Sequence, residues 1–113
     1  MKAYAQALDL IDDPGRIAEY VDWHHRVFPE VLRGLRALGL VNMKIFLHGV
    51  RLFMYFEAPD DFDPKTSYQS YAQSPRAQEW DAMMRRYQRP VPGADPGLWW
   101  QPMRCVFDLE TAR

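Results

Sequence analysis

The sequence predicts an α+β fold in which an antiparallel sheet carries helices on one face. Segments rich in apolar and aromatic residues alternate with segments whose apolar residues recur every three or four positions, which is typical of amphipathic helices. The chain has 113 residues, of which 48% are hydrophobic and 14% aromatic. That is enough apolar surface for one core, so we expect a single domain over residues 1–113.

The first third of the chain predicts one strand and two helical segments. Residues 2–10 are expected to form a strand. Asp12-Asp13-Pro14 predicts a helix start, because an Asp cap precedes a proline at the first helical position. This helix is expected to reach Val27, since the residue before Pro29 disfavours helical backbone. A second helical segment follows, and Gly39 is expected to end it as a C-cap.

A hairpin is predicted next. Residues 43–47 and 52–57 are rich in aromatic and long apolar side chains, and His48-Gly49-Val50-Arg51 separates them. Glycine readily adopts the positive φ that a tight hairpin turn requires. We therefore expect two antiparallel strands joined by a short turn.

The last half predicts a helix and a final strand. A short helix is expected over residues 64–72 and a stronger one from Ser74-Pro75, with apolar residues three and four apart. Residues 89–97 hold three prolines and two glycines, which predicts a rigid loop. Residues 98–109 are expected to form the last strand, with Pro102 at an edge or bulge because proline has no amide hydrogen for the ladder.

The predicted order is strand, helix, strand, strand, helix, strand. This is the split βαβ pattern of ferredoxin-like folds, with a four-stranded antiparallel sheet. Helices cover one face of that sheet, and the other face needs a cover if it is apolar. In a chain of this length, a second copy is the simplest cover, so we expect a symmetric homodimer.

Composition excludes several classes of protein and site. The formal net charge is −1, whereas non-specific nucleic-acid binding needs positive charge to displace phosphate counterions. Cys105 is the single cysteine, which excludes an internal disulfide and a cysteine-built zinc site. Residues 1–10 do not resemble a signal peptide, and no apolar run approaches the ~18 residues that span a bilayer. We therefore expect a cytoplasmic protein with neither a nucleic-acid nor a membrane partner.

Tyr20 and His24 are the first candidates for chemistry. Four residues apart on a helix, they lie on one face. A histidine can pass a proton near neutral pH, and a tyrosine hydroxyl can bind a substrate oxygen. From spacing alone, a core tyrosine beside a capped or exposed histidine is the simpler interpretation. Three histidines without matched carboxylates do not predict a metal site.

Tryptophans are the second group of candidates. Trp80 lies on the predicted second helix, and Trp99 and Trp100 lie on the predicted last strand. Aromatic faces can stack on the apolar face of a sugar, but they also serve as core or dimer contacts. Because adjacent strand residues point to opposite faces, at most one of Trp99 and Trp100 is expected to line a given pocket.

Residues 19–31, EYVDWHHRVFPEV, resemble the signature of the L-rhamnose mutarotases: a Tyr, a His four residues later, then an aromatic-Pro-Glu. Gln78-Glu79-Trp80 resembles the family's Gln-x-Trp helix motif, and the resemblance covers about residues 2–109. It implies a dimeric α/β barrel that interconverts the anomers of a 6-deoxy-hexose without a cofactor. It also implies that His24 donates a proton and that Tyr20 and Trp80 bind sugar.

Two positions depart from the rhamnose enzymes. Met43 stands where they carry a sugar-contacting Tyr, and Asp81 where they carry a second Trp. Residues 87–104 look more like the L-fucose branch of the family, so L-fucose is favoured over L-rhamnose. Met43, at the position of that Tyr, is expected to contact the sugar, and Trp100 and Arg104 are further candidates for sugar binding from residue type and position.

Two alternatives of other classes stay open. The same fold includes haem-degrading and cofactor-free monooxygenases, and one helix histidine beside aromatic and Met side chains would suit haem. A sugar-binding module without catalysis is the other alternative. A pure binder has no need for a titratable pair such as Tyr20 and His24.

Overall fold

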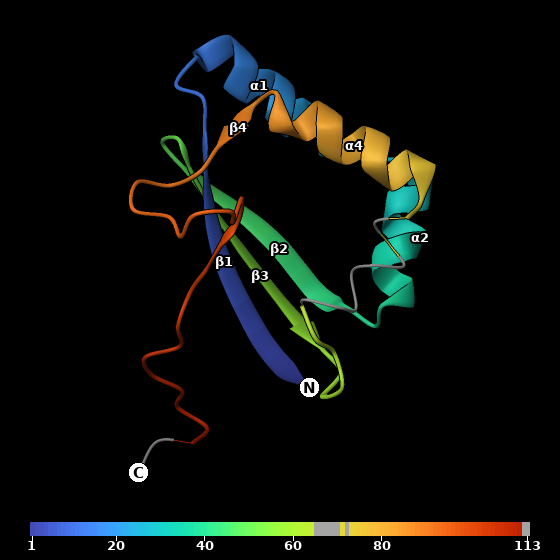
Figure 1. Cartoon of the computed structure of the whole chain (residues 1–113), viewed down its shortest axis with the longest axis vertical. Coiled ribbons are helices and arrows are strands. Elements are labelled where there is room, and N and C mark those ends of the chain that lie inside the picture. Colours follow the sequence, from blue (N-terminus) through green and yellow to red (C-terminus); the bar gives the residue numbers. More distant parts are fainter. Residues whose placement is uncertain (65–70, 72, 112–113) are drawn as a thin grey trace.

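The computed structural model describes residues 1–64, 71 and 73–111. Its elements follow in the order β1 (Lys2–Leu10), α1 (Pro14–Trp23), α2 (Pro29–Ala37), β2 (Val41–His48), β3 (Arg51–Ala58), α4 (Pro75–Arg85), β4 (Gln88–Arg89) and β5 (Gln101–Pro102) (Figure 1). The expected helix over residues 64–72 falls mostly outside the described residues.

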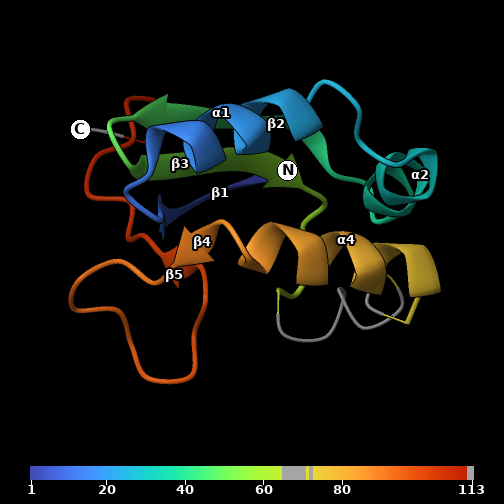
Figure 2. The ribbon, with the colours of Figure 1, turned by 90° about the horizontal axis from the view of Figure 1, so that it is seen from above.

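The strands form one antiparallel sheet in the order β2-β3-β1-β4, with β5 also paired to β1. The predicted ferredoxin-like α+β fold is thereby confirmed. Helices α1, α2 and α4 lie on the same side of this sheet (Figure 1). Seen from above, α1 and α4 run along the sheet, and α2 lies beyond the end of α1 and beside one end of α4 (Figure 2).

Local sequence signals start α1 and α4 and end α2 as expected. The Asp13 carboxylate accepts hydrogen bonds from the amides of Gly15 and Arg16 at 2.9 and 3.2 Å, which caps α1. The Ser74 hydroxyl caps α4 by accepting from the Ala77 amide at 3.4 Å. Gly39 has a φ of +82°, and an added Cβ there would lie 2.7 Å from Pro59, so both backbone and space require glycine after α2.

Helix α1 ends at Trp23, four residues before the expected Val27. From His24 to Arg26 each amide donates to the carbonyl three residues back, at 2.9 to 3.1 Å. This tighter turn replaces the helical ladder. His24 is therefore the C-cap of α1, and the segment up to Phe28 connects α1 to α2.

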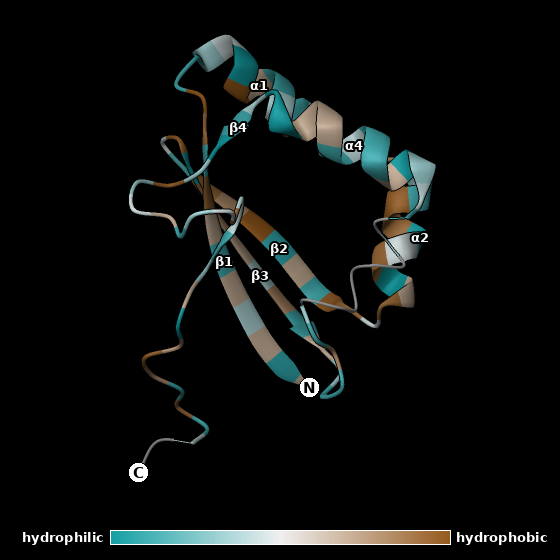
Figure 3. Cartoon of the chain, viewed as in Figure 1, coloured by the Kyte–Doolittle hydropathy of each residue, from teal (hydrophilic) through white to brown (hydrophobic). Residues whose placement is uncertain are grey.

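The predicted final strand over residues 98–109 is wrong in its length. Only Gln101 and Pro102 pair with β1, and the Met103 amide adds one bond to the Ala5 carbonyl at 2.8 Å. Pro102 has no amide hydrogen, which limits the ladder, and the chain then leaves β1 (Figure 1). This outer segment still carries exposed apolar residues, including Val106 and Phe107 (Figure 3).

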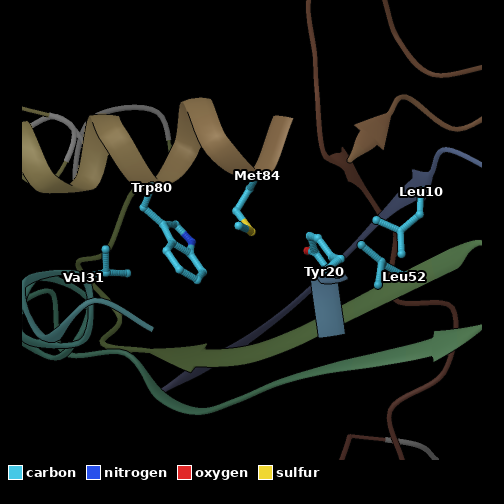
Figure 4. Packing of buried hydrophobic residues seen from close by; sticks show 6 residues of the cluster. All are labelled: Leu10, Tyr20, Val31, Leu52, Trp80 and Met84. Atoms are coloured by element: carbon cyan, nitrogen blue, oxygen red, sulfur yellow. The ribbon is translucent and has the colours of Figure 1, made fainter. Parts of the chain in front are cut away.

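The main core lies between the sheet and the helices. Leu10 and Leu52 from the sheet meet Tyr20, Val31, Trp80 and Met84 from the three helices (Figure 4). A second cluster at the other end of the sheet contains Leu40, Phe56, Ala58 and Phe62. None of the helices described here is long and apolar enough to cross a membrane.

Candidate active site

A cavity of about 1120 Å³ opens between the helices and the helix-facing side of the sheet. Five of the predicted site residues line it: Tyr20, His24, Met43, Trp80 and Trp100. Arg104 is not among the lining residues and is exposed on the C-terminal segment beyond β5. The cavity wall is mainly apolar with a few polar groups, which is typical of small-molecule sites.

Tyr20 and His24 lie together at this cavity, as their spacing predicts. Their ring centroids are 4.4 Å apart, and His24 Nδ1 lies 2.8 Å from the Tyr20 carbonyl oxygen. Because a carbonyl only accepts, Nδ1 carries the hydrogen of the neutral ring and Nε2 keeps its lone pair. The end of α1 thus presents one imidazole nitrogen that can take up a proton.

Burial shifts the pKa values of both Tyr20 and His24 away from their usual ranges. It lowers the pKa of His24, although the Tyr20 carbonyl partly opposes this shift by accepting from the protonated ring. Burial raises the pKa of Tyr20 to about 12, with the hydrogen bond from Gln88 acting in the opposite direction. At neutral pH the pair is therefore a neutral imidazole, able to act as a base, beside a neutral phenol.

Trp80 forms the aromatic wall next to this pair. Its ring lies edge-on to His24 at 5.5 Å and to Phe28 at 5.2 Å, and only 6% of the residue is exposed. Figure 4 shows Trp80, Met84 and Tyr20 pointing into the same space between helices and sheet. The predicted neighbourhood of a titratable group and an aromatic wall is present.

Both Trp99 and Trp100 line the cavity, contrary to the expectation that at most one does. The alternation rule does not apply, because both residues precede β5 and lie in irregular backbone. Trp99 Nε1 donates to Gln88 Oε1 at 2.8 Å, and Gln88 Nε2 donates to the Tyr20 hydroxyl at 3.2 Å. Sequence analysis missed this role of Gln88, since no spacing signal links residues 68 positions apart.

The sheet supplies the floor of the cavity. Met43 and Ile45 from β2, Met54 from β3 and Gln6 from β1 line it, and Gln6 Nε2 lies 3.2 Å from Met54 Sδ. Asp81 adds a carboxylate from α4, and burial raises its pKa. In the part of the chain that the structure describes, no cluster of three His, Cys, Asp or Glu residues could hold a metal ion.

The buried position of His24 predicts a pH-dependent stability. The unfolded chain takes up a proton at this histidine near the ordinary pKa of about 6.5, whereas the folded protein does so only at lower pH. The free energy of unfolding should therefore fall as pH decreases through 6.5. Urea unfolding of the wild type and His24→Gln at pH 7.5 and 5.5 should show the larger loss in the wild type. An NMR titration midpoint of His24 at or above 6.5 would contradict this.

The family of the chain is clear from comparison with known proteins. The model of the family described as L-rhamnose mutarotase matches residues 3–109. A UPF0734 protein of Dictyostelium discoideum is 48% identical and covers 96% of this chain and 90% of its own. An L-fucose mutarotase of Xanthomonas campestris is 38% identical, covering 99% and 91%. An L-rhamnose mutarotase of Leptothrix cholodnii is 31% identical, covering 87% and 89%.

A solved structure shares the fold. The crystal structure of an L-rhamnose mutarotase from Formosa agariphila superposes with a TM-score of 0.72 at 18% identity, covering 96% of this chain and 99% of that one. Together with the match over residues 3–109, the resemblance seen in residues 19–31 and 78–80 is confirmed. The chain belongs to the L-rhamnose mutarotase family, whose named relatives are carbohydrate isomerases.

Proposed function

We propose that this protein interconverts the α and β anomers of a 6-deoxy-hexose and that its preferred sugar is L-fucose. The observation that carries the proposal is the neutral His24 ring, 4.4 Å from Tyr20, at an aromatic-walled cavity large enough for a monosaccharide. The choice of L-fucose is supported by the 38% identity with an L-fucose mutarotase, against 31% with an L-rhamnose mutarotase. Met43 and Asp81 also support this choice, because they depart from the aromatic residues that the resemblance implies for the rhamnose enzymes at these positions.

The proposed reaction is ring opening followed by closure on the other face. His24 Nε2 takes the proton of the anomeric hydroxyl, C1 becomes a carbonyl carbon, and the bond from C1 to the ring oxygen breaks. The Tyr20 hydroxyl donates a hydrogen bond to that oxygen as negative charge develops on it. His24 then returns the proton to the same oxygen, the C1–C2 bond rotates, and the reverse steps form the other anomer.

The surrounding residues suit a sugar. Trp80 and Trp100 offer aromatic faces for its C–H groups, and Gln6 and Asp81 offer polar atoms for its hydroxyls. Positioned proton transfer contributes about 10²–10⁴ in rate, which suffices for a reaction that is spontaneous in water.

The test is proton exchange NMR on the anomeric signals of L-fucose and, separately, L-rhamnose, with catalytic amounts of protein. Faster α/β exchange than in buffer is expected for both sugars, with the larger effect for L-fucose. Faster exchange of L-rhamnose would overturn the sugar assignment alone. No acceleration across a panel of aldoses would overturn the function, and a Soret band after addition of haem would then favour the haem-binding alternative.

We also propose that two copies pack through the sheet face that the helices leave uncovered. Phe46 and Phe53 are cross-strand partners on that face, with ring centroids 6.2 Å apart, and Phe46 is 56% exposed. Tyr55, two residues from Phe53, shares the face and is half-buried. Exposed aromatic residues grouped on one face of a sheet are typical of an interface.

The dimer is testable at Phe46. Phe46→Lys places a charge at the centre of the proposed interface, so it should shift the protein from twice 13.3 kDa to the monomer mass in size-exclusion chromatography with light scattering. Ala82→Lys adds the same charge on the outer face of α4, where Ala82 is exposed, and should leave the mass unchanged. A monomeric wild type at micromolar concentration would contradict the proposal.

A further inference from the structure

We propose that Gln88 is a positioning residue, set by Trp99, that turns the hydroxyl proton of Tyr20 into the cavity. The inference rests on the proposed function, in which that proton is donated to the sugar. It goes further by assigning the direction of the hydroxyl to a glutamine and an indole on a different part of the chain.

Gln88 is a buried polar residue between two cavity-lining aromatics. It is 7% exposed, and its backbone is fixed by β4, where it pairs with Leu10 of β1. Its amide joins Trp99 Nε1 at 2.8 Å to the Tyr20 hydroxyl at 3.2 Å. All three side chains line the cavity. Burying a polar side chain costs free energy unless its groups are hydrogen-bonded, and here both ends of the amide are.

The indole decides which way the amide points. An indole nitrogen is a donor only, so the Gln88 oxygen must face Trp99. The amide NH2 group is then left facing Tyr20. With the opposite orientation, two N–H donors would meet at Trp99 and a buried donor would lose its partner, which costs about 1–3 kcal/mol.

The amide in turn decides the direction of the Tyr20 hydroxyl. Since its oxygen accepts from Gln88 Nε2, its own hydrogen points elsewhere. Among the described residues, the hydrogen bond from Gln88 is the one that the Tyr20 hydroxyl forms, and there the hydroxyl is the acceptor. Figure 4 shows the hydroxyl oxygen on the side of Tyr20 that faces Met84 and Trp80. The hydrogen is therefore available to a molecule in the cavity.

Trp99 is itself held in place. The Arg85 guanidinium of α4 lies 4.8 Å from the Trp99 ring centroid. Trp99 lies near the end of the segment that connects β4, which ends at Arg89, to β5, which begins at Gln101. Within this segment the Asp95 amide donates a hydrogen bond to Gln101 Oε1 at 2.8 Å. The orientation of one hydroxyl thus depends on how this segment packs.

The discriminating variant is Gln88→Glu. At pH 7.5 the introduced carboxylate accepts from both Trp99 and Tyr20, so the tyrosine proton turns away from the sugar. When protonated, the same group accepts from Trp99 and donates to Tyr20, which restores the original polarity. The ratio of its kcat to the wild-type kcat should be lowered about tenfold at pH 7.5 and recover at least severalfold by pH 5. The titratable and charged side chains that line the same cavity are present in both proteins, so the ratio isolates the new carboxyl group; they are His24, His25, Asp63, Asp81 and Arg85.

Two matched variants separate positioning from packing. Gln88→Met keeps a similar volume without hydrogen bonds, so its kcat ratio should be lowered at every pH without recovery in acid. Trp99→Phe leaves the amide free to turn over and should lower kcat by about twofold or more, with KM nearly unchanged. Trp99→Phe also keeps the test decisive if the introduced carboxyl group prevents folding.

A readout independent of activity completes the experiment. The indole N–H signal of Trp99 in a ¹H–¹⁵N spectrum should shift in Gln88→Met and exchange faster with solvent. An unchanged signal, or a pH-independent kcat ratio for Gln88→Glu in an active enzyme, would overturn the inference. A wild type that accelerates no sugar, with the indole signal responding as expected, would instead overturn the proposed function and leave the hydrogen-bond chain standing.

Discussion

His24→Ala is expected to lower the rate of anomer exchange by about 10²–10⁴ at neutral pH. In the proposed reaction the imidazole takes the proton from the anomeric hydroxyl, and burial keeps it neutral at that pH by lowering its pKa. Exchange NMR with L-fucose, after subtraction of the spontaneous rate, measures the loss.

His48→Ala is the matched control. His48 lies at the exposed end of β2 and does not line the cavity. The rate of anomer exchange with His48→Ala should therefore equal that of the wild type. Circular dichroism should show both variants folded, because His24→Ala removes one hydrogen bond to the Tyr20 carbonyl and the ring contacts with Tyr20 and Trp80 but none of the buried core residues. A folded His24→Ala variant with the wild-type rate would exclude His24 as the acid/base group.

Trp80→Ala is expected to lower the free energy of unfolding by about 3–5 kcal/mol, because it removes the largest buried side chain of the main core and leaves a cavity in its place. Trp80 packs edge-on against His24, Phe28 and Trp23, with ring centroids 5.2 to 6.4 Å away. The deletion enlarges the cavity and removes one wall of the proposed sugar site, so KM should rise as well. Urea unfolding followed by circular dichroism gives the stability change.

The neighbouring residue supplies the control for this loss. Glu79 lies next to Trp80 but is exposed, and its carboxylate pairs with Arg76 at 2.7 Å. Glu79→Ala should therefore change the unfolding free energy by less than about 1 kcal/mol. Equal losses in Glu79→Ala and Trp80→Ala would contradict the central place of Trp80 in the core.

The elements that sequence predicted well are those with strong local signals. Helices α1 and α4 begin at an Asp13-Pro14 and a Ser74-Pro75 pair, whose Asp and Ser side chains accept hydrogen bonds from the first amides of the helix. Gly39 follows α2 with a positive φ. Each of these signals acts within a few residues and does not depend on the rest of the chain. The hairpin turn at Gly49 is of the same kind. Two elements were predicted with wrong bounds. The helix α1 ends early in a local turn whose amides bond to carbonyls three residues back, whereas the length of the last strand depends on its pairing with β1.

The residues of the candidate site were also predicted best where a local spacing or motif pointed to them. Tyr20 and His24 were predictable because a spacing of four on a helix brings two side chains together wherever the helix packs. Met43, Trp80 and Trp100 were predicted as sugar contacts, and they do line one cavity with that pair. Arg104 was predicted from type and position alone, and the described chain carries it away from the cavity.

Sequence by itself therefore determined the class of fold, the family and the Tyr20–His24 pair, all of which depend on local chemistry or on motifs within short stretches. Only the tertiary structure decided that both Trp99 and Trp100 reach the cavity and that Gln88 links Trp99 to Tyr20. The physical reason is that a buried hydrogen-bond chain forms between groups brought together by β4 and the irregular segment after it. No periodicity encodes a contact between residues 68 positions apart.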